Sequence, residues 1–156
     1  GAPFRLATEA GLIDPRRTVQ IGIRGGQNFA DGLDYSRDKG MRVITIEEFD
    51  DLGWQAVAQE AKRVVGNGPA YLTFDVDGLD SSQVPSTGTP VPGGLYHWAA
   101  VELIECLFLA PGTNVIGADV NEIVPGQNDS VTQFNAALIA TKIVASHTAT
   151  RLNQKD

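Results

Sequence analysis

Residues 73–80 read TFDVDGLD, an apolar, strand-like run that ends in closely spaced acids. Because side chains i and i+2 of a β-strand point to the same face, we predict that Asp75 and Asp77 converge. Phe74 and Val76 would then point to the opposite face. The two aspartate Cα atoms would lie roughly 6.6 Å apart, where two carboxylates repel each other unless a cation lies between them. The pair is therefore a candidate ligand pair for a divalent metal ion, although a D-x-D pair taken alone is more often solvated or caps a turn.

Strand-like and helix-like stretches alternate on both sides of this segment. The predicted strands cover residues 18–24, 42–46, 70–75 and 114–120, and the predicted helices cover residues 3–11, 54–65, 98–109 and 130–149. The acidic run at 47–51 is predicted as the N-terminal turn of a helix, where the helix dipole favours acids. This alternation is typical of an α/β fold, so we predict a three-layer structure with a parallel sheet and helices on both faces. Residues 1–156 would form a single domain, with a long loop at 78–95 and a polar tail at 151–156.

Composition excludes several classes of protein. The net charge of −7 argues against nucleic acid as a partner, because phosphates require a basic surface. No apolar run is long enough to span a membrane, and the N-terminal residues lack the basic-then-apolar order of a signal peptide. The single cysteine, Cys106, rules out an internal disulfide framework. We therefore expect a cytoplasmic protein.

Acidic residues follow two of the predicted strands. Asp75 and Asp77 end the third strand, and Glu122 follows the fourth. Ligands of parallel α/β sheets bind beyond the carboxyl ends of the strands, so these side chains could share one crevice. Taken alone, Glu122 could be a surface residue and Thr89 a turn residue. Arg24, after the first predicted strand, could contact an anion, form a structural ion pair or lie at a subunit contact.

Several motifs together resemble one enzyme family. FDVDGLD at 74–80, followed by PSTGTPVPGGL at 85–95, closely resembles the third signature of the ureohydrolases, the family of arginase and agmatinase. GAPFR at 1–5 and VQIGIRG at 19–25 are similar to the agmatinase-like branch, and DVNEIVP at 119–125 resembles the family segment D-x-x-E-x-x-P. The resemblance implies an arginase-like α/β fold.

The resemblance covers only part of the family's catalytic domain. The family motifs G-G-D-H and D-A-H-x-D are absent, and the two histidines, His97 and His147, stand in other contexts. The chain is therefore expected to represent roughly the C-terminal half of a larger ureohydrolase domain. One position within the motifs departs from the family, since Asp80-Ser81 replaces the usual D-P.

The family chemistry is manganese-dependent hydrolysis of a linear guanidino compound to urea and an amine. The resemblance implies two Mn²⁺ ions in a complete site, with Asp75 bridging both ions and Asp77 binding one. It implies that Glu122 pairs with the guanidinium of the substrate and that Thr89 lines the site. Agmatine or guanidinobutyrate would be the type of substrate, and the family's oligomers imply a homo-oligomer.

A second hypothesis remains open. The chain could be a non-catalytic α/β module, or a self-associating fragment, without a dinuclear metal site. Two carboxylates alone hold a divalent ion weakly, because affinity rises with the number and charge of the ligands.

Overall fold

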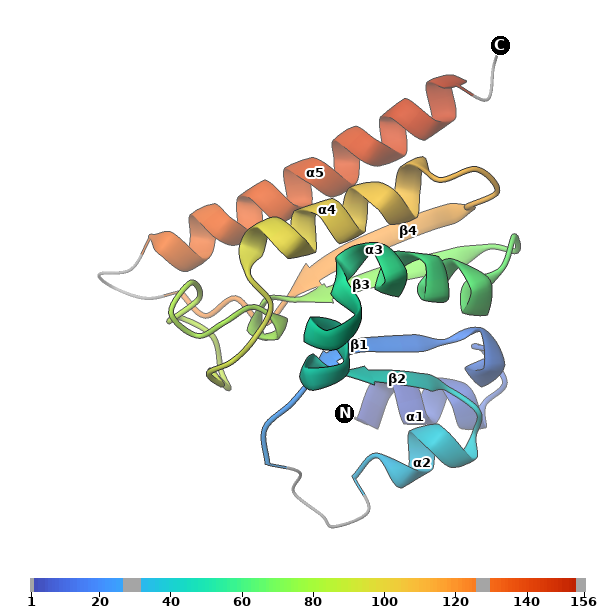
Figure 1. Ribbon diagram of the computed structural model, residues 1–156, viewed down its shortest axis with the longest axis horizontal. Helices are drawn as coiled ribbons and strands as arrows, with labels where there is room; N and C mark the ends of the chain where they lie inside the picture. Colours follow the sequence, from blue (N-terminus) through green and yellow to red (C-terminus); the bar gives the residue numbers. More distant parts are fainter. Residues whose placement is uncertain (1, 27–31, 126–129, 154–156) are drawn as a thin grey trace.

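The computed structural model describes residues 2–26, 32–125 and 130–153, which alternate between strands and helices (Figure 1). The helices are α1 (Ala2–Glu9), α2 (Asp34–Asp38), α3 (Ile46–Val65), α4 (His97–Leu109) and α5 (Val131–Asn153). The strands are β1 (Val19–Ile23), β2 (Arg42–Thr45), β3 (Ala70–Asp75) and β4 (Val115–Asn121). The 3₁₀ turn η1 (Pro15–Arg17) precedes β1, and the 3₁₀ turn η2 (Val76–Gly78) follows β3. The predicted α/β class is confirmed.

The strands form two parallel pairs. In the first pair β1 runs beside β2, with Ile21 opposite Ile44. In the second pair β3 runs beside β4, with Asp75 opposite Asn121. Within the described residues the two pairs are not joined by hydrogen bonds, so the single sheet expected from the sequence is present as two pieces.

Helices lie on both sides of the strands. Figure 1 shows α3, α4 and α5 together on one side, and α1 and α2 on the other side beside β1 and β2. One continuous core joins the larger helices to both strand pairs, and its fully buried members include Ile44, Val57, Leu79, Ile104 and Ile139. Each such side chain stabilises the fold by about 1.5–3 kcal/mol. In the described part of the chain no helix is sufficiently long and apolar to cross a bilayer.

Helix α3 begins before the apolar period at 54–65 and includes the acidic run at 47–51, which the sequence predicted as the N-terminal turn of a helix. Thr45 caps it, because its side-chain oxygen accepts a hydrogen bond from the backbone N–H of Glu48. The path then breaks at Gly53, which has a φ of 77° inside α3. The apolar helical period restarts only after this break, which is why residue 54 looked like the first helical position.

The C-terminal boundary also differs from the prediction. Helix α5 continues to Asn153, so residues 151–153 belong to the helix and not to a polar tail. Residues 154–156 lie outside the described residues. The short helix α2, at residues 34–38, was not predicted.

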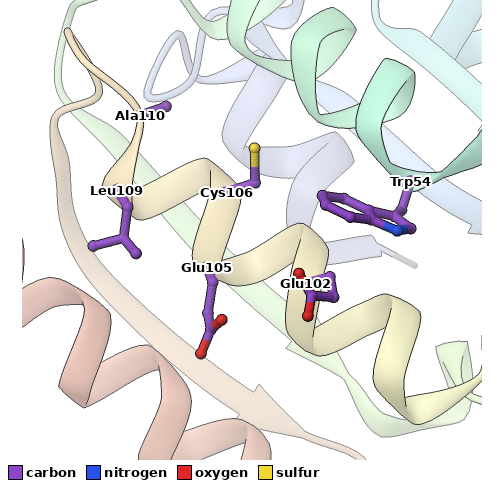
Figure 2. A pocket seen from close by; sticks show the side chains of 6 residues that line it. All are labelled: Trp54, Glu102, Glu105, Cys106, Leu109 and Ala110. Carbon is purple, nitrogen blue, oxygen red and sulfur yellow. The ribbon is translucent and has the colours of Figure 1, made fainter.

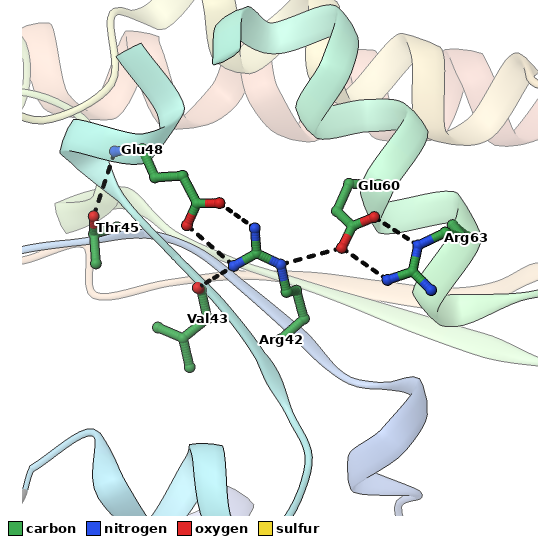
Figure 3. Close-up of polar contacts among 6 residues, drawn as sticks. All are labelled: Arg42, Val43, Thr45, Glu48, Glu60 and Arg63. Atoms are coloured by element: carbon green, nitrogen blue, oxygen red, sulfur yellow. Dashed lines mark hydrogen bonds and ion pairs between the residues drawn. The ribbon is translucent and has the colours of Figure 1, made fainter. Parts of the chain in front are cut away.

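A charged network fastens α3 to β2 (Figure 3). Arg42 at the start of β2 binds both carboxylate oxygens of Glu48, one of them at 3.0 Å from Nη1, and its Nε donates to Glu60 at 3.1 Å. Arg63 donates to the same Glu60 carboxylate at 2.7 and 2.9 Å. The hydrogen bonds from Arg63, with a smaller contribution from Arg42, lower the pKa of Glu60 to about 2. The network is distant in the chain from the predicted site and has a structural role.

Candidate functional site

Asp75 and Asp77 lie at the carboxyl end of β3, but only Asp75 is in the strand. Residues Val76–Gly78 form the 3₁₀ turn η2, and Asp75 caps it by accepting a 3.0 Å hydrogen bond from the backbone N–H of Asp77. The predicted strand alternation therefore does not extend to Asp77. The turn brings the second carboxylate back towards the first, and the fully buried side chain of Val76 anchors the turn in the core.

The two carboxylates influence each other. Partial desolvation, followed by the neighbouring charges of Asp77 and Glu122, raises the pKa of Asp75 to about 6, while the N–H of Asp77 acts in the opposite direction. Like charges that are held together in this way favour either a proton or a cation between them. The predicted proximity of Asp75 and Asp77 is present, and Glu122 is close enough to contribute.

Thr89 is brought to the same place by the loop between β3 and α4. Its hydroxyl donates to Oδ2 of Asp77 over 2.7 Å. The resemblance implied that Thr89 lines the site, and the structure brings its hydroxyl to Asp77. The hydroxyl therefore orients that carboxylate and occupies one of its lone pairs.

Glu122 follows β4 in an uncommon backbone conformation. It has a φ of 63°, the one positive φ among the described non-glycine residues. The loop before α4 holds it there, because Thr87 donates to the carbonyl of Glu122 at 2.8 Å and pairs with Ile123 in an antiparallel bridge. The side chain lies over Gly88, where an added Cβ would be 3.4 Å from Oε2. Non-glycine residues held in this region are concentrated at functional sites.

Two features of the site were not predicted from the sequence. Asp119, on the same face of the strand pair as Asp75, accepts a 2.8 Å hydrogen bond from Thr73 and a further one from Asn121. Arg24 inserts its guanidinium among backbone carbonyls of the turn that carries Asp77. The alternation of polar residues at 73, 75, 119 and 121 is the signal that could have revealed the first feature.

The donor set fits a hard divalent cation in part. Carboxylates are ligands that Mn²⁺ accepts readily, and both partial desolvation and the neighbouring like charges raise the pKa of Asp75. However, residues 2–26, 32–125 and 130–153 contain no cluster of three or more His, Cys, Asp or Glu side chains arranged to hold a metal ion. The assignment of Asp75 and Asp77 as metal ligands therefore stays a prediction.

A hollow of about 350 Å³ between α3 and α4 contains none of the four predicted site residues (Figure 2). It is lined by Trp54, Glu102, Glu105, Cys106, Leu109 and Ala110. Glu105 is already paired with Lys142 at 2.6 Å, and the free thiol of Cys106 is half-buried. The predicted site lies instead at the carboxyl ends of β3 and β4.

The sequence matches the model of the arginase family over residues 1–146. The chain belongs to the arginase family. One curated relative, guanidinopropionase of Pseudomonas aeruginosa, is 50% identical to this chain over 125 residues, which are 80% of this chain and 38% of that protein. Agmatinase of Edwardsiella ictaluri is 39% identical over 145 residues, which are 92% of this chain and 44% of that protein.

Solved structures of the arginase family share the fold. Proclavaminate amidinohydrolase from Streptomyces clavuligerus superimposes with a TM-score of 0.84 at 36% identity, covering 93% of this chain and 46% of that one. Formiminoglutamase from Trypanosoma cruzi, a structure with Mn²⁺, gives a TM-score of 0.82 at 25% identity, covering 92% and 48%. The chain thus spans less than half the length of these relatives.

Proposed function

We propose that this chain supplies part of the active site of a manganese-dependent hydrolase that converts a linear guanidino compound to urea and an amine. One observation carries the proposal. Asp75, Asp77 and Glu122 lie at the carboxyl ends of two adjacent parallel strands, and the hydroxyl of Thr89 binds the carboxylate of Asp77. Relatives named guanidinopropionase and agmatinase support this reaction class.

Each residue has a distinct role in the proposal. Asp75 and Asp77 would hold the metal, and the hydroxyl of Thr89 orients the carboxylate of Asp77. When bound, Mn²⁺ supplies the Lewis acidity that lets water attack at neutral pH. Each carboxylate must be ionised to act as a ligand, so the proton that Asp75 holds below a pH of about 6 has to leave before the metal binds.

Glu122 is the proposed partner of the substrate cation. A carboxylate can accept two parallel hydrogen bonds from a guanidinium, which fixes both the charge and the plane of the reacting group. The positive φ of Glu122 directs the side chain out of the strand, and its backbone carbonyl is held by Thr87. The loop before α4 thereby holds Glu122 close enough to Asp75 for its charge to help raise the pKa of that carboxyl.

The substrate is proposed to be a guanidino compound of the agmatine or guanidinobutyrate type. A second candidate substrate is guanidinopropionate, which is favoured by the 50% identity to guanidinopropionase. We further propose that the protein works as a cytoplasmic homo-oligomer.

The test is urea release by the protein as its gene encodes it. The protein is stripped with a chelator, reloaded with Mn²⁺, and assayed with agmatine, 4-guanidinobutyrate, 3-guanidinopropionate and arginine. We expect urea from at least one compound, only after manganese is restored, and a loss of at least about 10³-fold for Asp77→Asn. Release of no urea from any of the four would refute the proposal.

The alternative is a non-catalytic module, which is favoured by the incomplete ligand set of the described residues. Metal analysis separates the two functions. Two manganese ions per chain in the purified protein exclude the module, whereas a protein that folds and retains no manganese supports it.

A further inference from the structure

Arg24 forms several hydrogen bonds to backbone carbonyls beside the candidate site. It follows β1 directly, and its Nη2 donates to the backbone carbonyls of Asp77 at 2.6 Å, Leu79 at 2.9 Å and Val91 at 2.8 Å. Its Nη1 lies 3.4 Å from the carbonyls of Gly22 and Gly78. One half-buried side chain thus joins three segments of the chain.

The acceptors around Arg24 are carbonyl oxygens instead of carboxylates. Within the described residues Arg24 forms no ion pair, and its buried Nε has no hydrogen-bond partner. The surroundings are closely packed, because a Cβ added at Gly94 would lie 2.6 Å from Nη2. The planar guanidinium offers several donors in fixed directions, whereas a lysine ammonium is a compact point charge that cannot bridge the same acceptors.

Arg24 joins two segments that determine the position of the Asp77 side chain. One is the turn that carries Asp77 itself, through the carbonyls of Asp77 and Leu79. The other is the loop containing Val91, two residues after Thr89, whose hydroxyl binds the Asp77 carboxylate. Arg24 therefore fixes the distance between the backbone of Asp77 and the hydroxyl that orients its side chain.

We propose that Arg24 is a positioning residue that holds the Asp77 turn and the Thr89 loop in the geometry required to bind the metal. This inference rests on the proposed function, because it takes Asp77 to be a ligand. Groups that orient a ligand commonly change metal affinity by about 10- to 100-fold when they are replaced.

Arg17 provides a matched control at the other end of the same strand. Its Nε donates to the carbonyl of Val65 at 2.8 Å and its Nη2 to the carbonyl of Pro69 at 3.3 Å, so it also joins separate segments through carbonyl oxygens. Val65 ends α3 and Pro69 precedes β3, whereas the candidate site lies at the far end of β3. Replacing Arg17 perturbs a similar set of contacts away from the site.

The experiment compares Arg24→Lys and Arg17→Lys with the parent in the protein as its gene encodes it. Manganese affinity is measured by electron paramagnetic resonance of free Mn²⁺ during titration, and the thermal midpoint of each metal-free protein is recorded. We expect Arg24→Lys to weaken manganese binding by about 10- to 100-fold and Arg17→Lys to leave it unchanged at a similar loss of stability. Unchanged affinity in Arg24→Lys, or an equal loss in both variants, overturns the inference. A parent that binds no manganese refutes the proposed function itself.

A second measurement requires no variant. Because the contacts of Arg24 are all to atoms of the protein itself, the hydrogen-bonded backbone N–H groups of residues 77–95 should be protected from hydrogen exchange before manganese is added. Free exchange over this segment in the metal-free parent, with protection appearing only on addition of manganese, would show that the arginine does not preorganise the site.

Discussion

The hydroxyl of Thr89 donates to Oδ2 of Asp77 over 2.7 Å, across twelve positions of the sequence. The bond fixes the plane of the Asp77 carboxylate, and it does not involve the other oxygen, Oδ1. It connects the loop before α4 to the turn after β3, which are the two segments that carry the T-G-T-P and D-V-D motifs. The motifs thus form one structural unit.

Removal of this hydroxyl should weaken metal binding. Thr89→Val keeps the shape of the side chain but loses the donor, and a hydrogen bond to a charged group contributes about 1.5–3 kcal/mol. We expect manganese affinity to fall by about tenfold or more. Thr89→Ser retains the donor and should bind manganese within about threefold of the parent. Equal affinities for the valine and serine variants, measured by titration, would contradict the assigned role.

Neutralising Asp75 should stabilise the metal-free protein at pH 7. The pKa of Asp75 is raised to about 6, so its contribution to stability is present in acid and is lost as the pH rises through that value. Asn can still accept the hydrogen bond from the N–H of Asp77. We expect Asp75→Asn to raise the free energy of unfolding by about 1 kcal/mol at pH 7, after allowance for solvent screening, and by much less at pH 5.

Asp80→Asn is the control, because the opposite change in the free energy of unfolding is expected for it. Hydrogen bonds from Ser82, and then from the N–H of Gly93, lower the pKa of Asp80 to about 2. Asp80→Asn should therefore destabilise the metal-free protein at pH 7, as measured by urea unfolding. If Asp75→Asn also destabilises it, the two acids do not repel each other as described.

The Arg42 network predicts a loss of stability in acid. Because the pKa of Glu60 is lowered to about 2, its contribution is complete above its unfolded value of 4.5 and is lost as the pH falls towards 2. Glu60→Gln should cost about 1 kcal/mol at pH 7, and the difference from the parent should shrink between pH 4.5 and pH 2. Glu9→Gln, which removes an exposed pair with Arg5, should change little at either pH. A cost for Glu60→Gln that is independent of pH would contradict the assignment.

The chain is expected to self-associate. The two strand pairs are not hydrogen-bonded to each other within the described residues, and α5 exposes apolar side chains such as Phe134, 73% exposed, and Val144, 65% exposed. Unpaired strand edges and apolar surface favour association. Light scattering after size exclusion should give a mass above that of one chain, whereas a clean monomer at low concentration would contradict this prediction.

Local sequence patterns predicted the strands better than the helix boundaries. Each predicted strand lies within one residue of its observed limits, because apolar runs bounded by polar turns mark buried parallel strands. The acidic turn at 47–51 and the apolar period at 54–65 were predicted separately, because Gly53 interrupts the period within one helix. Helix α2 has no apolar stripe, and tertiary contacts hold it, with Tyr35 packed against the guanidinium of Arg5 at 4.6 Å.

The site was predicted in its residue types but not in its geometry. The resemblance to the ureohydrolase motifs singled out Asp75, Asp77, Thr89 and Glu122, and the structure brings their segments together. The turn at Val76–Gly78 and the carbonyl contacts of Arg24 were not predictable, since the latter join residues 53 to 67 positions apart. Contacts at such separations depend on how the loops close and leave no local pattern.

Manganese stoichiometry tests the central claim most directly. The protein as its gene encodes it, and its Asp77→Asn variant, are titrated with Mn²⁺, and bound metal is counted by electron paramagnetic resonance and by elemental analysis after dialysis. The account predicts two ions per chain in the parent and the loss of at least one in the variant, with the fold unchanged by circular dichroism. Equal numbers of ions, bound with equal affinity in both proteins, would show that Asp77 is not a metal ligand.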